Sequence, residues 1–228
     1  MRNKQLLMNM AAVLEPLLDK IVFVGGCAVD YLITDPAAGD TRITEDVDVI
    51  AEIVSKKEFY ELQEQLKTLG FAEKMPSDEE TIPLCRMEYN KMLLDIMPTE
   101  GSVLGFTNRW YLPALKSAKE IVLENGLTIR LISPAYFIAT KLSAFRSRGK
   151  SDFYCHDMED IINVINGNIN IVTEILSSDE DVKNYIRSEF IEITKDRLFL
   201  TNCIPGHLDN EDIERTEIVY KKIQDVIS

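Results

Sequence analysis

The chain of 228 residues has few histidines, few cysteines and no long apolar run, and each shortage excludes a class of protein. Two histidines cannot build a histidine-rich metal site. The four cysteines are widely spaced and form no C-x-x-C pair, which predicts buried thiols of a cytoplasmic protein rather than disulfides or a zinc site. No run approaches the ~18 apolar residues of a membrane span. The first residues lack the pattern of a signal-peptide core, so we expect no membrane association.

Basic residues are also scarce. The chain has 25 Lys plus Arg against 38 Asp plus Glu, a formal charge of −13. Such a balance argues against a general nucleic-acid coat protein, because phosphates are neutralised by a basic surface. A local basic groove stays open as an alternative. Apolar residues at 46% and charged residues at 28% are typical of a globular chain.

Hydrophobic periodicity predicts two halves that differ in character. The first mixes helices at 5–19, 27–33 and 56–69 with strands at 21–24, 47–53, 84–87 and 92–97. After Ser133-Pro134 only helices are predicted, at 135–148, 158–165, 169–176, 181–199 and 210–227. We therefore expect an α/β core over residues 1–132 followed by a helical half over 133–228.

Two motifs of the first half suggest chemistry. Gly25-Gly26 follows a buried strand and leaves backbone N–H groups open to a phosphate. On the next strand Asp46 and Asp48 point to the same face, where they repel one another unless a cation lies between them. Carboxylate oxygens suit Mg²⁺, which binds one or two carboxylates together with substrate phosphates. The alternatives are a plain tight turn and a solvated acidic strand edge.

A third acid is found in an apolar strand. Asp95 is the only charged residue of Met92-Leu-Leu-Asp-Ile-Met97. A lone buried carboxylate is costly without a partner. A metal shared with Asp46 and Asp48 would supply that partner, whereas an Asp at the exposed end of the strand would need none.

The helical half places two charges on apolar stripes. Lys141 lies at helical spacing among Phe137, Ile138 and Phe145, so it needs an anion or reaches water along its own stem. Asp157 shares a stripe with residues 161 and 164, and it is either a functional acid or an N-terminal cap. His156 beside it is more typical of a structural hydrogen bond than of a catalytic base.

These residues together resemble a known superfamily. Gly25-Gly26, Arg42-x-Thr44-x-Asp46-x-Asp48 and the strand acid Asp95 are similar to the nucleotidyltransferases of the DNA-polymerase-β type. The later Lys141 and Asp157 segments narrow the resemblance to AbiEii/AbiGii-type proteins, which are toxin-like nucleotidyltransferases of bacterial toxin–antitoxin and phage-defence systems. The resemblance covers about residues 20–165 and implies an α+β fold, a mixed sheet flanked by helices and followed by a C-terminal helical bundle.

The resemblance also implies roles for individual residues. Gly25 and Gly26, with Arg42 and Thr44 of the second motif, would bind the NTP. Asp46 and Asp48 would hold Mg²⁺, and Asp95 would be the third acid, as a metal ligand or as the group that deprotonates the acceptor hydroxyl. Lys141 would contact phosphates, Asp157 matches a family acid near the site, and the helical half would complete that site. Gly-Gly in place of the commoner Gly-Ser, and a long gap before Asp46, leave the specificity open.

The resulting hypothesis is an Mg²⁺-dependent enzyme that moves an NMP from an NTP to an acceptor hydroxyl on a tRNA, a protein or a small molecule, with a cognate antitoxin as a partner in the toxin case. An RNA acceptor would need Arg42, Arg146, Arg148 and Lys150 to line one groove, given the net acidity. The alternatives are a non-catalytic regulatory or antitoxin-binding module of the same fold and a small-molecule transferase of the aminoglycoside-modifying kind.

Overall fold

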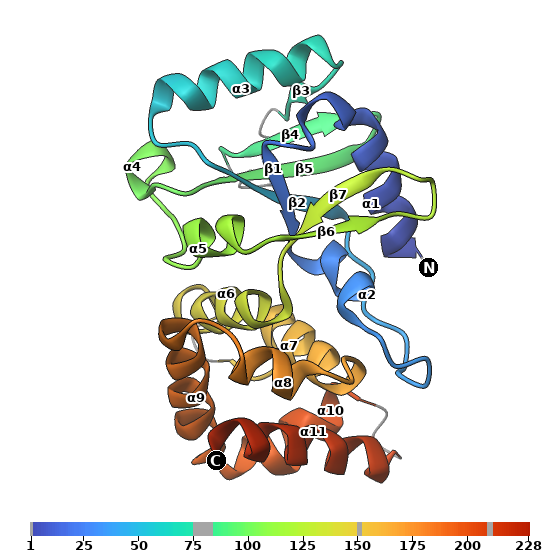
Figure 1. Ribbon diagram of the computed structural model, residues 1–228, viewed down its shortest axis with the longest axis vertical. Coiled ribbons are helices and arrows are strands. Elements are labelled where there is room, and N and C mark those ends of the chain that lie inside the picture. Colours follow the sequence, from blue (N-terminus) through green and yellow to red (C-terminus); the bar gives the residue numbers. More distant parts are fainter. Residues whose placement is uncertain (1, 75–83, 150–151, 209–211) are drawn as a thin grey trace. The chain divides into compact units, whose positions relative to one another are not determined.

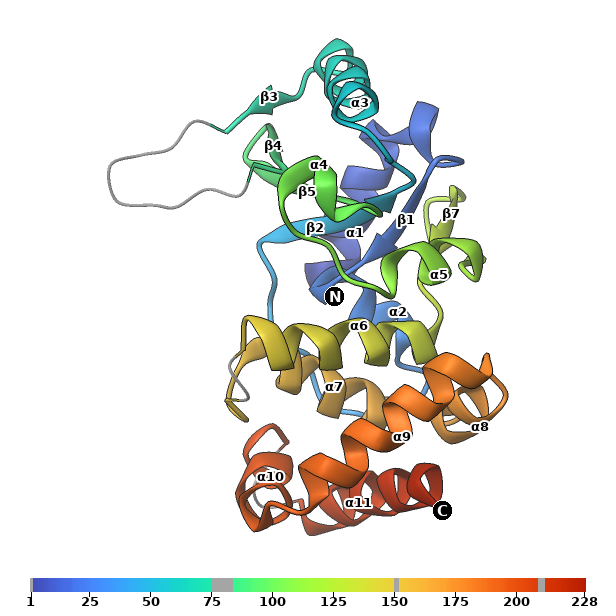
Figure 2. The same ribbon diagram turned by 90° about the vertical axis from the view of Figure 1, so that its left-hand side faces the viewer.

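The protein divides into two compact units. A computed structural model describes residues 2–74, 84–149, 152–208 and 212–228. The first unit joins Met1–Asp30 to Ile43–Ser133, and the second joins Tyr31–Arg42 to Pro134–Ser228. Figures 1 and 2 show the elements of each unit from two directions.

The first unit is built on a mixed seven-stranded sheet with the order β3-β4-β5-β2-β1-β7-β6. β2 pairs parallel with β5, β1 pairs parallel with β7, and the other neighbours are antiparallel. The strands are β1 (Ile21–Val24), β2 (Asp46–Ala51), β3 (Ala72–Glu73), β4 (Arg86–Tyr89), β5 (Met92–Pro98), β6 (Lys119–Val122) and β7 (Thr128–Leu131). The described helices of this unit include two long ones, α1 (Arg2–Val13) and α3 (Lys56–Thr68), and two short ones, α4 (Gly101–Leu104) and α5 (Tyr111–Lys116).

Burial along the central strands separates a core face from a polar face. All four residues of β1 are buried, as expected for a strand covered on both sides. In β2 the side chains of Val47 and Val49 are buried and those of Asp46 and Asp48 are partly exposed, which confirms the predicted alternation. The strand therefore presents its two acids on the face opposite to the apolar pair.

Helix α3 shows how local sequence sets an element. The side chain of Ser55 accepts from the backbone N–H of Glu58, whose carboxylate accepts from the N–H of Ser55, a complete capping box. The helix buries Phe59 and Leu66, and its Gln63 side chain reaches Met87 of β4, so α3 packs beside the β3–β4 end of the sheet (Figure 1).

The second unit consists of helices and connecting loops, with no strand among the residues that the structure describes. Its main helices are α6 (Pro134–Ser147), α7 (His156–Gly167), α8 (Ile171–Leu176), α9 (Glu180–Thr194) and α11 (Ile213–Ile227), with a π-helical turn at Phe199–Cys203 leading into α10 (Ile204–Gly206). The short α2 (Val29–Leu32) leads from the first unit into the segment 31–42. That segment packs on α7, since the N–H groups of Thr34 and Asp35 both donate to the carbonyl of Gly167.

The α+β fold class is confirmed, and several predicted boundaries are wrong. The helix expected over 5–19 ends at Val13 and gives way to a 3-10 turn at Glu15–Leu17, because Pro16 cannot donate the helical hydrogen bond. The helix expected over 181–199 ends at Thr194. Strands β3, β6 and β7 and helices α4 and α5 were not predicted, since these segments are short and have little apolar periodicity. No helix among the described residues has the length and apolarity to cross a membrane.

Candidate active site

Three predicted acids lie together on the polar face of the first unit's sheet. Asp46 and Asp48 are on β2, and Asp95 is on the neighbouring β5, where its backbone position is directly opposite Asp48. Residues opposite one another on paired strands place their side chains on the same face. The sheet register therefore gathers the three carboxylates, as the sequence pattern predicted, within the first unit alone.

Gly25 lies in the turn after β1, directly against the side chain of Asp48. Its φ is +69°, and an added Cβ would lie 1.8 Å from the Oδ2 atom of Asp48. Only glycine adopts this backbone conformation and leaves room for that carboxylate. The next residue, Gly26, starts a buried 3-10 turn at Gly26–Ala28. The diglycine turn and the second motif acid thus meet in space.

Thr44 orients the first acid. Its hydroxyl donates to the Oδ1 atom of Asp46 at 2.9 Å, and its backbone N–H donates to the side-chain oxygen of the buried Asn3. The thiol of Cys27 also donates to the backbone carbonyl of Asp46, at 3.1 Å. In the structure, Thr44 therefore orients the carboxylate of Asp46.

A cation that the sequence analysis missed binds two of the acids. Arg86 of β4 donates through Nε and one Nη atom to both oxygens of Asp95, at 2.7 Å each. The same Nη atom donates to the Oδ2 atom of Asp46 at 2.7 Å. Hydrogen bonding to Asp95 raises the already high pKa of Arg86, so the guanidinium stays charged. Asp95 is buried, and its partner in the structure is this arginine.

A turn in the sequence could have identified Arg86. Asn90 and Lys91 both have positive φ, which is the two-residue hairpin turn that joins β4 to β5. Counting outward from that turn pairs Tyr89 with Met92 and, three positions further out, Arg86 with Asp95. The signal was weak because Asn-Lys replaces the usual Asn-Gly.

A cavity of about 490 Å³ opens in the first unit, and none of Asp46, Asp48 and Asp95 is among its lining residues. Thr44, which donates to Asp46, forms part of its wall, as does Leu93, which is opposite Asp46 in the sheet. The remaining walls carry both signs of charge, from Arg2, Leu6, Glu45, Lys74, Glu88 and Lys91. The cavity offers space for a polar group beside the first motif acid.

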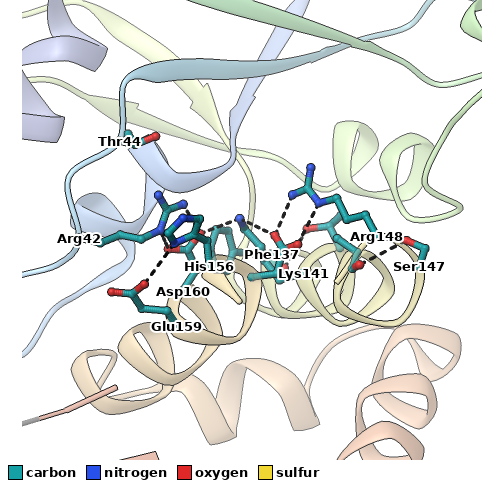
Figure 3. A network of polar contacts seen from close by, with 12 residues as sticks. Arg42, Thr44, Phe137, Lys141, Ser147, Arg148, His156, Glu159 and Asp160 are labelled. Atoms are coloured by element: carbon teal, nitrogen blue, oxygen red, sulfur yellow. Dashed lines mark hydrogen bonds and ion pairs between the residues drawn. The ribbon is translucent and has the colours of Figure 1, made fainter. Parts of the chain in front are cut away.

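The second unit contains its own charge network, which joins helices α6 and α7 (Figure 3). Lys141 is buried, and its Nζ atom contacts Asp157 at 3.1 Å and Asp160 at 2.6 Å. Arg42 donates twice to Asp160, at 2.8 and 2.9 Å, and Arg148 donates twice to Asp157, at 2.9 and 2.8 Å. Lys141 therefore has anionic partners from the protein, and its ammonium does not depend on water.

The two acids of this network are held ionised. Burial opposes the charge of Asp157, but hydrogen bonds from Arg148 and the charge of Lys141 outweigh it and lower the pKa to about 2. Asp160 is almost fully buried, yet Lys141 and Arg42 lower its pKa in the same way. Asp157 is the second residue of α7, and its carboxylate binds these cations instead of capping the helix. Asp160 was not among the predicted site residues.

Other predicted cations and bases are also bound by the protein. Arg146 pairs with Glu189 of α9 at 2.7 Å. His156 is exposed, and its Nδ1 atom lies 3.5 Å from a carboxylate oxygen of Glu159, a surface contact. Lys150 lies outside the described residues. Three of the four cysteines, Cys27, Cys85 and Cys203, are buried as predicted, whereas Cys155 is only half-buried.

The acid face suits a divalent cation through its donor chemistry, which is carboxylate oxygen alone. In the part of the chain that the structure describes, no three His, Cys, Asp or Glu side chains are grouped closely enough to hold one ion. Both carboxylate oxygens of Asp95 accept hydrogen bonds from Arg86, so Asp95 is occupied by this ion pair. Asp46 and Asp48 are then the pair that fits Mg²⁺, with further ligands from substrate phosphates.

The fold identifies the class of protein that this chain resembles. A nucleotidyltransferase-like antigenic protein of Paracoccidioides brasiliensis has a similar structure, with a TM-score of 0.50 and 19% sequence identity over 89% of this chain and 92% of that chain. The protein therefore has a nucleotidyltransferase-like fold. No protein-family model matches the chain, and no curated protein is significantly similar to it in sequence.

Proposed function

We propose that the protein is an Mg²⁺-dependent nucleotidyltransferase that moves an NMP from an NTP to an acceptor hydroxyl. The observation that carries the proposal is the face shared by Asp46, Asp48 and Asp95, closed by the Gly25 turn. The nucleotidyltransferase-like fold supports it. Asp46 and Asp48 would hold Mg²⁺, which supplies the charge that stabilises phosphoryl transfer when it is bound.

The remaining residues have separate proposed roles. The N–H groups of the Gly25-Gly26 turn would bind triphosphate oxygens. Asp95 would position or deprotonate the acceptor hydroxyl. In the second unit Lys141, whose ammonium contacts Asp157 and Asp160, is proposed to contact phosphate oxygens.

The acceptor is proposed to be a tRNA end or a protein, as in a bacterial cytoplasmic toxin of the AbiEii type with a cognate antitoxin. The mixed-charge cavity beside Thr44 would admit a polar acceptor group. Against an RNA acceptor, Arg42, Arg146 and Arg148 each bind a carboxylate of the protein. A steep salt dependence of binding would favour RNA, and harmless expression would favour a small-molecule acceptor.

Calorimetric titration of each NTP, with Mg²⁺ and with EDTA, tests the proposal. We expect Mg²⁺-dependent binding of at least one NTP, abolished in an Asp46→Asn/Asp48→Asn double variant. The control is Glu52→Gln/Glu61→Gln, which removes two exposed carboxylates of the same unit. Unchanged binding by the Asp variant would contradict the proposal.

A second function, a non-catalytic binding module of the same fold, is favoured by one observation. Arg86 binds both oxygens of Asp95 and one oxygen of Asp46, as a structural ion pair would. Absence of any NTP binding by the intact protein would favour this module over the enzyme.

A further inference from the structure

Arg86 makes two contacts of unequal strength on the acid face. Its contact with Asp95 uses two parallel hydrogen bonds, and the Asp95 side chain is only 6% exposed. Its contact with Asp46 uses one Nη atom already shared with Asp95, and the Asp46 side chain is 30% exposed. Two-point pairs with buried carboxylates are the stronger kind, and single contacts at partly solvated carboxylates are the weaker.

The sheet register explains this asymmetry. Arg86 is directly opposite Asp95 in the antiparallel β4–β5 pair, so the backbone itself aligns the two side chains. Asp46 is two strands away from β4 and two residues out of register with Arg86, since Arg86 and Asp48 are both opposite Asp95 whereas Asp46 is opposite Leu93. The guanidinium thus reaches Asp46 along a diagonal, and it can leave that carboxylate without breaking its pair with Asp95.

We propose that Arg86 is a positioning residue that holds Asp95 permanently and competes with a divalent cation for Asp46. In this arrangement Asp46 exchanges the guanidinium for the cation, while the two-point pair keeps Asp95 fixed toward the acceptor side. The inference rests on the proposed function, because it takes Asp46 and Asp48 as the cation ligands. It adds a charge that lowers cation affinity until a substrate brings its own phosphates.

The charge of Arg86 affects cation binding as well as its contacts do. Asp46, Asp48, Asp95 and Arg86 sum to a formal charge of −2, and the guanidinium lies 2.7 Å from one of the cation's proposed ligands. A positive charge at this distance opposes a second one, and it does so strongly where water is partly excluded. Removing the guanidinium should therefore tighten cation binding, whereas loss of a merely structural arginine would weaken it.

Titration of Mn²⁺ into the NTP-free protein, followed by electron paramagnetic resonance, tests the inference. We expect Arg86→Gln to bind Mn²⁺ about ten-fold more tightly than the unaltered chain, which corresponds to about 1.4 kcal/mol. Arg86→Lys keeps the charge but loses the two-point geometry, so we expect its affinity to stay near that of the unaltered chain. Arg130→Gln is the matched control, because Arg130 is in the same sheet and donates to the backbone carbonyls of Asp19 and Leu115.

Three outcomes are decisive. Tighter binding by Arg86→Gln, lost again when Asp48→Asn is added, supports the inference. Equal or weaker binding by Arg86→Gln overturns it and leaves the proposed function standing. Absence of Mn²⁺ binding in both proteins overturns the proposed cation site together with the inference.

A measurement on the unaltered chain covers the case in which Arg86→Gln does not fold. The Nε–H group of Arg86 donates to Asp95, so its NMR signal should stay protected from exchange with water when Mg²⁺ is added. At the same time we expect the carboxyl ¹³C signal of Asp46 to shift. Loss of the Nε–H protection, or an unshifted Asp46 signal in the presence of bound Mg²⁺, would contradict the exchange.

Discussion

The two units differ in how their charged side chains are paired. On the acid face of the first unit, the guanidinium of Arg86 binds two of the three carboxylates, those of Asp46 and Asp95, and the four side chains sum to a formal charge of −2. In the network of the second unit, the carboxylates of Asp157 and Asp160 bind three cations, and these five side chains sum to a formal charge of +1. The first group of side chains therefore suits a cation, whereas the second is held together by ion pairs within its own unit.

Burial differs as well, and it predicts different responses to mutation. Asp160 and Lys141 are buried, whereas Asp46 is partly exposed. Breaking a buried ion pair leaves an uncompensated charge in a medium of low polarity, while a partly solvated carboxylate can turn to water. We therefore expect the network to matter most for folding and the acid face most for ligand binding.

The largest effect should follow from Asp160→Asn. This change leaves Arg42 and Lys141 without the carboxylate that joins them, and we expect it to lower the free energy of unfolding by about 3–5 kcal/mol. Urea unfolding followed by far-ultraviolet circular dichroism measures the loss. Glu159→Gln, its neighbour on α7 with only a surface contact to His156, should change stability by less than about 1 kcal/mol. Equal losses in the two variants would remove the distinction between buried and surface charge.

The next effect is expected from Gly25→Ala on the acid face. The backbone strain at φ +69° and the collision with Asp48 should together cost about 2–3 kcal/mol and abolish metal-dependent NTP binding. Gly126→Ala is the matched control, because Gly126 also has positive φ but has no atom within 4 Å of the added Cβ. We expect the control to lose about 1 kcal/mol and to keep full NTP binding. NTP binding by Gly25→Ala at the level of the control would show that the close approach to Asp48 is unimportant.

The smallest effect should come from lowering the pH. Burial opposes the charge of Asp157, but Arg148 and Lys141 lower its pKa from 3.8 to about 2 in the folded chain. Asp157 therefore takes up a proton at a lower pH in the folded state than in the unfolded state. The stabilisation is complete above about pH 4 and is lost as the pH falls toward 2. We expect a loss of about 2 kcal/mol across this window, measured by urea unfolding at successive pH values. The loss should be smaller in Asp157→Asn, and an identical pH profile would contradict this assignment.

Local sequence patterns were enough to predict the helices and strands whose apolar residues recur at a regular spacing. The strands of Asp48 and Asp95 and the helices of Lys141 and Asp157 were predicted because their apolar residues recur at spacings of two or of three to four. The strands β6 and β7 were missed, since each has only four residues and β6 lies at the edge of the sheet with little buried surface. The packing of 31–42 on α7 was not predicted either, because its backbone hydrogen bonds leave no pattern in the sequence and its ion pair joins Arg42 to the distant Asp160.

The candidate site was predicted as a set of residues but not as a set of partners. Gly25, Asp46, Asp48 and Asp95 do meet on one face, yet the counter-charge of Asp95 is Arg86, which the sequence analysis did not select. In the second unit the analysis selected Lys141 and Asp157 for their places on apolar stripes. It overlooked Asp160, although the same reasoning about a buried acid applies to it.

The amino-acid sequence by itself determined which side chains share a strand face or a helix stripe, because backbone geometry repeats every two or 3.6 residues. It therefore determined the charge on the face of β2 and the burial of Lys141. Only the tertiary structure decided which charges neutralise one another, because the partners of Asp95 and Asp160 come from strand register and helix packing between distant residues. Those pairings separate a face with excess negative charge from a network with excess positive charge.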